Sequence, residues 1–388
     1  MTEILLTIFF ISVLLFFLGS GIWVALSMIG VSAIGMMLFT SRPVGDAMAT
    51  TIWGTSSSWT LTALPLFVWM GEILFRTKLS ENLFKGLSPW MQKLPGGLIH
   101  VNIVGCALFA AISGSSAATV ATVGKMSIPE LRKRKYPEKI LLGSLAGSGT
   151  LGLLIPPSII LIIYGVAVQE SIAKLFIAGI IPGIMIALIF MSYVIIWSLI
   201  NKKTMPKILE EYSFIDKIKR SKQLLPVIIL IVAVIGSIYT GIATATEAAS
   251  LGVLGALILS YFQKSLTVET FKSSLLGATK TSCMIAFILA GSTFLSLAMG
   301  FTGLPRNLAL WIQNMELSPY VLIFVLMIFY IILGMFLDGI SAVVLTMAII
   351  EPMIRQAGFD MIWFGIFLVI VVEMAQITPP VGFNLFVL

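Results

Sequence analysis

The sequence predicts an all-α membrane protein that crosses the bilayer many times. Of its 388 residues, 59% are hydrophobic and only 11% are charged, whereas about a quarter of a soluble domain is charged. The mean hydropathy of +1.07 agrees with this interpretation. These values exclude an ordinary soluble enzyme, a disordered protein and a nucleic-acid binder, and they make the lipid bilayer the expected environment of the chain.

Apolar runs of about membrane length divide the chain. A spanning helix needs roughly 20 apolar residues, so there is room for about ten crossings. Gly, Ala, Ser and Thr are frequent in these runs, as they are in helices that pack against one another inside a membrane. The runs cover 4–18, 21–39, 58–75, 96–112, 140–168, 173–200, 224–240, 243–262, 281–300, 320–337 and 361–388.

Most cations lie in four segments between these runs, namely 76–93, 125–139, 201–222 and 263–280. Lys and Arg gather on the cytoplasmic side of inner-membrane proteins, so all four segments are expected to be cytoplasmic loops. The net charge of +7 therefore reflects topology rather than binding to nucleic acid.

This orientation creates a conflict around residues 94–124. The flanking segments 76–93 and 125–139 are both expected in the cytoplasm, so the residues between them cannot form a single crossing. The simplest solution is a re-entrant hairpin that rises through 96–112, turns at Ser113–Ser116 and returns. Non-helical backbone survives at membrane depth only inside protein or beside a watery cavity. The turn is therefore a candidate site.

A second hairpin is expected at 320–354, entering from the opposite face. The two hairpins are related in sequence, because Ser113–Ala117 aligns with Asp338–Ala342. Downstream, Leu154–Ser158 aligns with Ile377–Val381 at an offset of 223 (377 − 154). Similar sequence inserted from opposite faces is an inverted repeat, which is the architecture of many secondary transporters. The repeat also predicts one more helix after Leu388, in roughly 30–40 further residues of chain.

Both repeats contain a helix interrupted by two prolines. Each Pro-Pro pair removes two backbone N–H donors and disfavours helix at the preceding residue, which leaves carbonyls free. Free carbonyls and hydroxyls suit Na⁺, although a single proline pair would be explained by a simple kink. We expect two Na⁺ sites, each built from a hairpin tip and a break. The first draws on Ser113, Gly114, Ser115, Gly152, Ile155 and Pro157, and the second on Gly339, Ser341, Thr346, Thr378 and Gly382.

A hairpin tip also exposes the N-terminus of its second arm, whose free N–H groups attract an anion. An organic acid is therefore expected against Ser115 and Ser116. Asp338 is a carboxylate inside the membrane, which makes it a functional candidate by default. It could bind substrate hydroxyls, help to hold a cation, or cap the following helix. Glu247 is expected only to cap its helix, and Glu72 receives no role.

Other motifs predict no further chemistry. Gly147–Gly152 spells GxGxxG, but no strand precedes it, and no Walker A, HExxH or GxSxG motif occurs. An intramembrane enzyme that used Asp338 with Glu373 would need both carboxylates in one watery cavity, and no paired-aspartate motif supports it. We therefore expect a protein that is not an enzyme. Cys106 and Cys283 lie in apolar runs and are expected to be packing residues.

Several motifs together resemble one transporter family. They are the tip ISGSSAATVATVG, the break LIPPS, the turn TEAAS, the second tip LDGIS and the closing ITPPVGFNLF. In combination they resemble the large (M-type) membrane subunit of tripartite ATP-independent periplasmic (TRAP) transporters, over about residues 1–388. The family's turn usually reads TPTEAA, whereas Ala245 replaces the proline in this sequence. The family also has a final helix after the second break, which is expected beyond Leu388.

The resemblance implies an elevator-type secondary transporter, similar in plan to divalent anion/sodium symporters. A mobile transport domain, made of 94–172 and 281–388, would hold both hairpins and both broken helices. Residues 1–93 and 173–280 would form scaffold helices and a basic connector. Two or more Na⁺ ions would drive uptake of an organic acid across a bacterial inner membrane. By this resemblance the substrate site falls on Ser115 or Ser116, Ser158 and Asp338, and the Na⁺ sites on the tips and breaks named above.

Two partners are implied by the same resemblance. A periplasmic substrate-binding protein (P type) would deliver the acid, and a small four-helix membrane subunit (Q type) would enlarge the scaffold. The second tip, LDGISAVVLT, differs from that of sialic-acid systems and favours a C4-dicarboxylate or a sugar acid. The alternative is a stand-alone Na⁺/carboxylate symporter of related fold that needs no binding protein.

Overall fold

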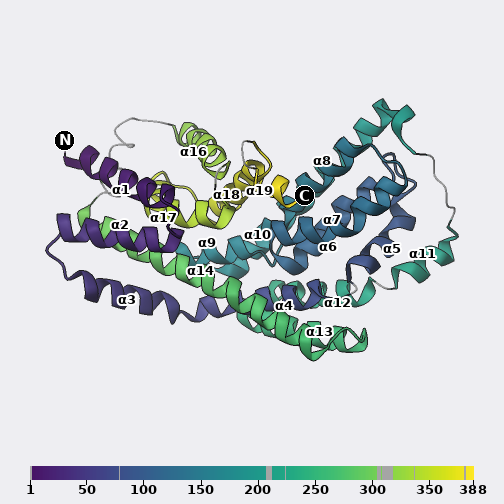
Figure 1. Ribbon diagram of the computed structural model, residues 1–388, viewed down its shortest axis with the longest axis horizontal. Helices are drawn as coiled ribbons and strands as arrows, with labels where there is room; N and C mark the ends of the chain where they lie inside the picture. The colour runs from purple at the N-terminus through teal and green to yellow at the C-terminus, as the bar shows by residue number, and fades with distance from the viewer. Residues whose placement is uncertain are drawn as a thin grey trace.

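The computed structural model describes residues 2–77, 79–206, 212–222, 224–303, 307, 318–335, 337–379 and 382–388, and every regular element in them is helical (Figure 1). The N-terminal part contributes helices whose middle members pack around a long central helix, α14 (Val268–Thr302). These elements are α1 (Thr2–Gly19), α2 (Val24–Phe39), α3 (Val44–Ser56), η1 (Trp59–Thr62), α4 (Ala63–Phe75) and α5 (Leu79–Met91).

The next elements form the first predicted hairpin and broken helix, α6 (Ile99–Ser113), α7 (Ser116–Lys133), α8 (Glu138–Gly149), η2 (Thr150–Leu153) and α9 (Ile159–Ala167). Helices α6 and α7 pack side by side and are joined by only two residues. Gly114 makes this turn possible, because its φ of +59° is a left-handed conformation that residues with a side chain rarely adopt. The chain then leaves the helical path between η2 and α9, at the first Pro-Pro pair.

A second group of helices follows the first broken helix along the chain. It comprises α10 (Ile172–Ile200), η3 (Lys202–Thr204), α11 (Phe214–Ser221), α12 (Leu225–Tyr239), α13 (Ala245–Phe262) and α14 (Val268–Thr302). Helix α14 packs on α2, α3, α4 and α17, whereas α13 packs on α4 and α12. Helix α14 therefore touches both the N-terminal helices and the second hairpin.

The C-terminal elements repeat the order hairpin, helix, break and helix, as α16 (Pro319–Gly334), α17 (Gly339–Gln356), α18 (Met361–Gln376) and α19 (Phe383–Val387). The bounds match those of the first repeat closely. Helices α7 and α17 both have 18 residues, and their first residues differ by 223 (339 − 116). The pair α8–η2 starts and ends 223 residues before α18 does (361 − 138 and 376 − 153). The repeated order is plain, and the opposite insertion of the two units stays a prediction.

By length and composition, four described helices can each cross a membrane, namely α10, α13, α14 and α17, or six if the bent pairs α3–α4 and α11–α12 each count as one span. The described chain also contains five shorter apolar helices of 10–17 residues. The protein is thus a multi-pass helical membrane protein. The second hairpin, expected over 320–337 and 342–354, has its arms in α16 and α17. Residues Pro380 and Val381 of the second break lie outside the described residues.

The structure corrects two expectations about the polar segments. Three of the four basic segments are largely helical rather than looped: 76–93 contains α5, 125–139 begins inside α7, and 263–280 continues into α14 from Val268. Hydropathy alone did not show this, because a helix that extends beyond the apolar region loses its apolar pattern. Helix α3 was not expected at all. None of its residues is buried, and its low apolar content hid it from a search for apolar runs.

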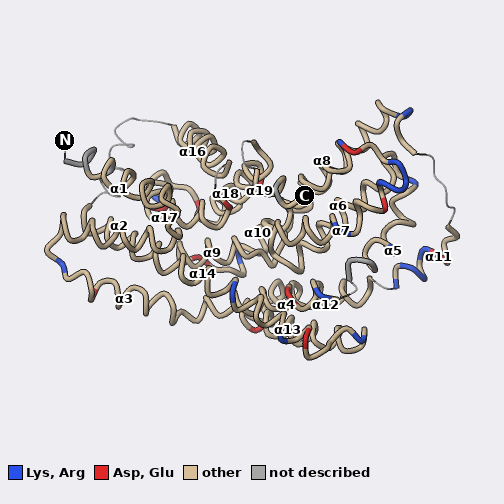
Figure 2. Tube along the Cα trace, in the orientation of Figure 1, with Lys and Arg blue, Asp and Glu red and all other residues tan. Residues whose placement is uncertain are grey.

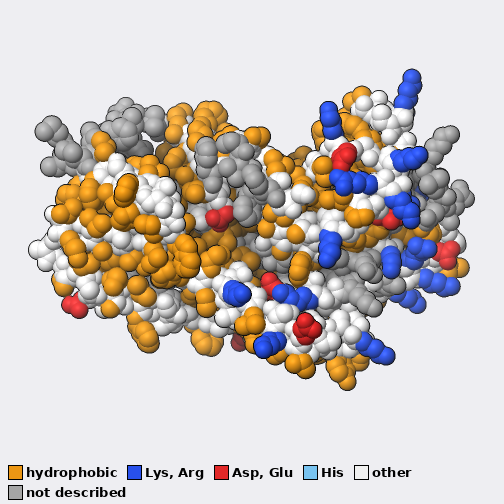
Figure 3. Space-filling view, in the orientation of Figure 1, with side chains coloured by type: hydrophobic (Ala, Val, Ile, Leu, Met, Phe, Trp, Pro, Cys, Tyr) orange, Lys and Arg blue, Asp and Glu red, His pale blue; other side chains and the backbone are white. Residues whose placement is uncertain are grey.

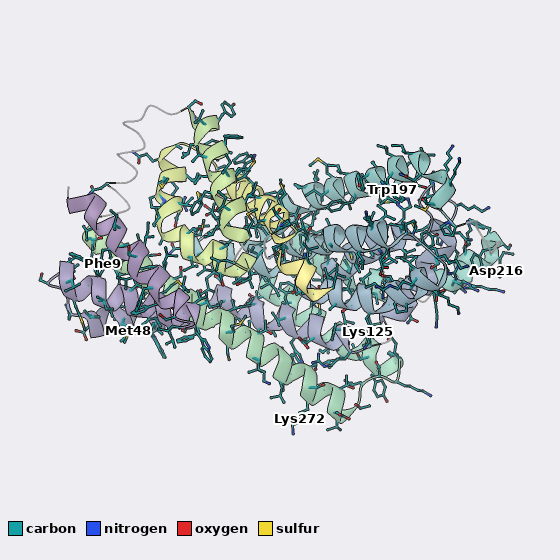
Figure 4. The ribbon with its side chains drawn as sticks, turned by 45° about the horizontal axis from the view of Figure 1, so that its top comes forward. Phe9, Met48, Lys125, Trp197, Asp216 and Lys272 are labelled. Carbon is teal, nitrogen blue, oxygen red and sulfur yellow. The ribbon has the colours of Figure 1, made fainter. Side chains whose placement is uncertain are left out.

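Charge is distributed unevenly over the molecule. Figure 2 shows Lys and Arg gathered at one end, around the α7–α8 connection and α11, with a further group near α13. Figure 3 shows a broad hydrophobic surface over the opposite end, where α1, α2 and α14 lie. In Figure 4, Lys125, Asp216 and Lys272 lie away from Phe9 and Met48. A concentration of cations in a few segments is the pattern expected of basic cytoplasmic segments.

Candidate functional site

Both hairpin tips open into one cavity of about 1170 Å³. We call residues 113–116 tip 1 and residues 338–341 tip 2, and all eight line it. The remaining wall comes from α7, the end of η2, the first turn of α9, the end of α18, and from α4, α14 and α2 with the two residues before it. The cavity therefore lies between the two repeats on one side and the helices expected to form the scaffold on the other.

Tip 1 is held by bonds within its own turn. The hydroxyls of Ser113 and Thr119 lie 2.9 Å apart, and the Thr119 hydroxyl also donates to the Ser115 carbonyl at 2.7 Å. Ser115 is the N-cap of α7, where its hydroxyl accepts a long hydrogen bond of 3.5 Å from the Ala118 N–H. No acidic residue lies in the first turn of α7. This helix terminus is thus positive in character and capped by a neutral side chain.

Tip 1 also packs directly on the first break. The Ile159 N–H donates to the Gly114 carbonyl at 3.2 Å. A Cβ atom on Gly114 would lie 2.6 Å from the Pro157 carbonyl oxygen, and one on Gly152 would lie 2.7 Å from the Ser115 carbonyl. Only glycine at both positions permits this close approach of backbone to backbone. The structure therefore brings together five of the six residues proposed for the first Na⁺ site.

The break offers the free oxygen atoms that the proline pair predicts. Among the described residues, none donates a hydrogen bond to the carbonyl oxygens of Ile155 and Pro157. Ile155 is the sixth residue of that site and packs against Gly183 of α10. Unpaired carbonyls beside a serine-rich turn are hard oxygen ligands that suit an alkali cation. No group of three or more His, Cys, Asp or Glu gathers in the described part of the chain.

Tip 2 differs from tip 1 in its cap. Asp338 is the N-cap of α17, and one of its oxygens, Oδ2, accepts from the N–H groups of Ile340 and Ser341 at 3.1 and 3.2 Å. Of the three roles considered for Asp338, the cap is thus confirmed. Its second oxygen, Oδ1, has no hydrogen-bond partner among the described residues, and Asp338 lines the cavity. The residue can therefore cap its helix and still present a carboxylate oxygen to the cavity.

The other residues proposed for the second Na⁺ site do not all gather at tip 2. Gly339 and Ser341 line the cavity. Thr346 lies further along α17, where its hydroxyl is 2.6 Å from the Tyr330 hydroxyl and links the two arms of the hairpin. Thr378 and Gly382 lie beside each other in the second break, because a Cβ on Gly382 would be 3.4 Å from the Thr378 carbonyl. Neither of them lines the cavity.

Ser158 occupies a supporting position. It is fully buried, and as the N-cap of α9 its hydroxyl accepts from the Leu161 N–H at 3.3 Å and donates to the Leu153 carbonyl. It is not among the residues that line the cavity, whereas the following Ile159 is. Its contact with substrate stays a prediction.

Sequence reasoning missed Gln376, the last residue of α18. Its side chain is buried, and its Oε1 accepts from the Ser116 hydroxyl at 2.9 Å. Tip 1 is thus joined to the end of α18, 260 residues away in sequence. A polar residue in an apolar run, directly before the second break, was the signal that could have identified it. Position 376 matches Leu153 in the first repeat (376 − 223).

The scaffold side of the cavity carries its own polar groups. Glu72 of α4 forms an ion pair with Arg76, and Lys280 of α14 lines the cavity without a partner in the described residues. Cys283 also lines the cavity and is exposed, so the prediction that it is a packing residue is wrong. It lies on the α14 face that turns toward the tips rather than toward another helix. Cys106 is buried, as predicted.

The helices and the cavity between two repeated units define a multi-pass membrane permease. The family model "Tripartite ATP-independent periplasmic transporter, DctM component" matches residues 9–388, and the chain belongs to this family. It is a transporter permease and not an enzyme. The resemblance drawn from the motifs is confirmed.

Curated relatives cover most of the chain. It is 33% identical over 357 residues to a C4-dicarboxylate TRAP transporter large permease protein of Pseudomonas aeruginosa, an alignment that covers 92% of this chain and 82% of the relative. It is 31% identical to a sialic acid TRAP transporter large permease protein of Vibrio cholerae, covering 95% and 86%. It is also 30% identical to an isethionate TRAP transporter permease protein, DctMQ, of Oleidesulfovibrio alaskensis, covering 96% of this chain and 58% of the relative.

Proposed function

We propose that this chain is the large permease of a Na⁺-coupled importer that takes an organic acid from a periplasmic binding protein. The observation that carries the proposal is the single cavity into which both hairpin tips open. Membership of the TRAP family and the organic acids named for its relatives support the substrate class. Those relatives differ in substrate, so a C4-dicarboxylate, a sugar acid and a sialic acid are the first candidates.

The two tips favour different parts of the substrate. The N-terminus of α7 carries a neutral serine cap and no acidic residue in its first turn, so it is the better place for a carboxylate. The N-terminus of α17 is already capped by the carboxylate of Asp338, which would repel a second anion. We therefore assign the substrate carboxylate to Ser115 and Ser116, and substrate hydroxyls or a coordinated cation to Asp338.

Sodium ions are proposed as the driving ions. The first ion would bind at the contact of tip 1 with the first break, where the Ile155 and Pro157 carbonyls lack donors. The second would bind near Gly339 and Ser341, with Thr346, Thr378 and Gly382 as further candidates. Cations at these positions would neutralise the negative charges of the substrate carboxylate and of Asp338. An anion could therefore enter a cavity that already holds a carboxylate.

The mechanism that fits this arrangement is an elevator. The repeats that carry the tips would move together against α2, α4 and α14, so that the cavity faces each side of the bacterial inner membrane in turn. A small four-helix membrane subunit and a periplasmic binding protein are the proposed partners, and the fused relative DctMQ supports the first of them. A stand-alone symporter of related fold remains the alternative, and the binding protein distinguishes the two.

The test is uptake of radiolabelled acid into proteoliposomes that contain the full-length permease and its small subunit, with the binding protein outside. Succinate, a sialic acid and 2,3-diketo-L-gulonate would be compared under an inward Na⁺ gradient, an inward H⁺ gradient and no gradient. We expect uptake that needs both Na⁺ and the binding protein. Uptake with Na⁺ alone would support the stand-alone symporter, and uptake driven by H⁺ would refute sodium coupling.

A further inference from the structure

Gln376 occupies a special position between the two tips. Its side-chain oxygen accepts from the Ser116 hydroxyl of tip 1 at 2.9 Å. Its nitrogen lies on the other side, where a Cβ atom on Gly339 of tip 2 would be 2.9 Å away. The residue is only 2% exposed, yet it contributes to the wall of the cavity. One side chain thus reaches both tips of the site.

In the structure, the oxygen end of the Gln376 amide faces Ser116 and the nitrogen end points away from it. A carboxamide has an acceptor end and a donor end, and rotation by half a turn exchanges them. Because Ser116 donates to Oε1, the two N–H groups of Nε2 point the other way. They make no hydrogen bond with the described part of the chain. Because Gln376 lines the cavity, these N–H groups are free to donate to a ligand bound there.

We propose that Nε2 of Gln376 donates a hydrogen bond to a carboxylate oxygen of the bound organic acid, so that Gln376 is a substrate-contacting residue. This inference rests on the proposed function. The charge pattern agrees with it, because the neighbouring N–H groups of Ile340 and Ser341 are already taken by Asp338. Tip 2 therefore has few donors of its own to offer, and Gln376 adds one between the two tips, next to the N-terminus of α7 to which the carboxylate is assigned. The Ser116 hydroxyl orients the amide, while the N–H groups at the N-terminus of α7 remain available to the carboxylate.

Two substitutions separate the donor from the link to tip 1. Gln376→Leu keeps the approximate side-chain volume, but it removes both the Nε2 donor and the hydrogen bond with Ser116. Gln376→Glu keeps an oxygen that can accept from Ser116, but it replaces the donor by an acceptor. We expect Gln376→Leu to raise the KM for uptake by about ten- to a hundredfold, the range for a hydrogen bond to a charged group, with a smaller change in maximal rate.

The Gln376→Glu variant provides a measurement that would not change if Gln376 had only a structural role. Its uptake, divided by that of the wild-type protein at the same pH, should rise as the pH falls from 7.5 to 6. Protonation of the new carboxyl removes the repulsion of the substrate and restores a donor. If Gln376 served only to join the tips, Gln376→Glu would transport like the wild-type protein and this ratio would not depend on pH.

Gln92 provides the matched control. It is also a buried glutamine, with 6% exposure, and its Nε2 also lacks a partner, but it does not line the cavity. Gln92→Leu should leave KM unchanged, and size-exclusion chromatography in detergent reports whether each variant is folded. An unchanged KM in Gln376→Leu, or an equal rise in Gln92→Leu, would overturn the inference. Wild-type uptake that needs neither Na⁺ nor binding protein would instead refute the proposed function.

Discussion

Gly152 allows a direct test of the contact between tip 1 and the first break. In Gly152→Ala the new Cβ would lie 2.7 Å from both the carbonyl carbon and the carbonyl oxygen of Ser115, and 2.9 Å from the Ser116 nitrogen. All three are backbone atoms of the tip, so they cannot move aside as a flexible side chain would. Such overpacking costs about 1–3 kcal/mol. The same change in an open helical position would be favourable by about 0.5–1 kcal/mol.

We expect this strain to displace tip 1 from the free carbonyls of Ile155 and Pro157. If the overpacking destabilises only the ion-bound state, its cost of about 1–3 kcal/mol corresponds to roughly 5- to 150-fold weaker Na⁺ binding, since 1.36 kcal/mol is a factor of ten. The assay is the Na⁺ concentration that gives half-maximal uptake in proteoliposomes. The expected result is a large increase in that concentration with the folded protein still recovered from detergent.

Gly143 in α8 is the control for this experiment. No atom lies within 4 Å of the position that its Cβ would take, so Gly143→Ala should have normal Na⁺ dependence and equal or slightly higher thermal stability. A Gly152→Ala protein with the wild-type Na⁺ dependence would refute the argument that tip 1 and the break form an ion site.

Three further predictions concern charge and capping around the cavity. Asp338→Asn should keep the helix cap and hence thermal stability, since Asn and Asp cap equally well, but it should reduce uptake; unchanged uptake would show that the cap is its sole role. Ser115→Ala and Thr244→Ala should each lose about 1 kcal/mol of cap stabilisation, and only Ser115→Ala should lose transport, because the capping box of Thr244 lies away from the cavity. Lys280→Met should raise the KM for a dicarboxylate more than for a monocarboxylate, and this difference should shrink as salt is added to the uptake assay.

The sequence predicted the local features of the site well. A Ser-Gly-Ser-Ser run between apolar segments indicates a turn, and the structure places the helix end at Ser113 with left-handed Gly114 after it. The Pro-Pro pair in the first repeat predicted an interrupted helix, and the structure breaks the helix between η2 and α9, where the carbonyls of Ile155 and Pro157 accept no hydrogen bond from the described residues. Both signals depend on neighbouring residues along the chain, which is why they could be recognised without a structure.

What the sequence could not show is which side chains meet across the repeats. Gln376 belongs to the site because α18 ends beside Ser116, and Cys283 belongs to it because α14 turns that face to the tips. Conversely, Thr346 lies in α17, the helix that begins at tip 2, yet its hydroxyl forms a hydrogen bond with Tyr330 of α16 instead of facing the cavity. These outcomes depend on helix packing between distant segments, and no periodicity in the sequence specifies them.

The hydrogen bond between Ser116 and Gln376 also has a consequence for biosynthesis. Chains are made at roughly 5–20 residues per second, so tip 1 leaves the ribosome about 13–52 s before its partner. During that interval a polar turn must persist in a growing membrane protein without the contact that completes it. The bonds of Ser113 and Ser115 with Thr119 are available from the start, since they span only six residues. Tip 1 can therefore fold early on its own turn, while the complete cavity forms only after α18 has been inserted.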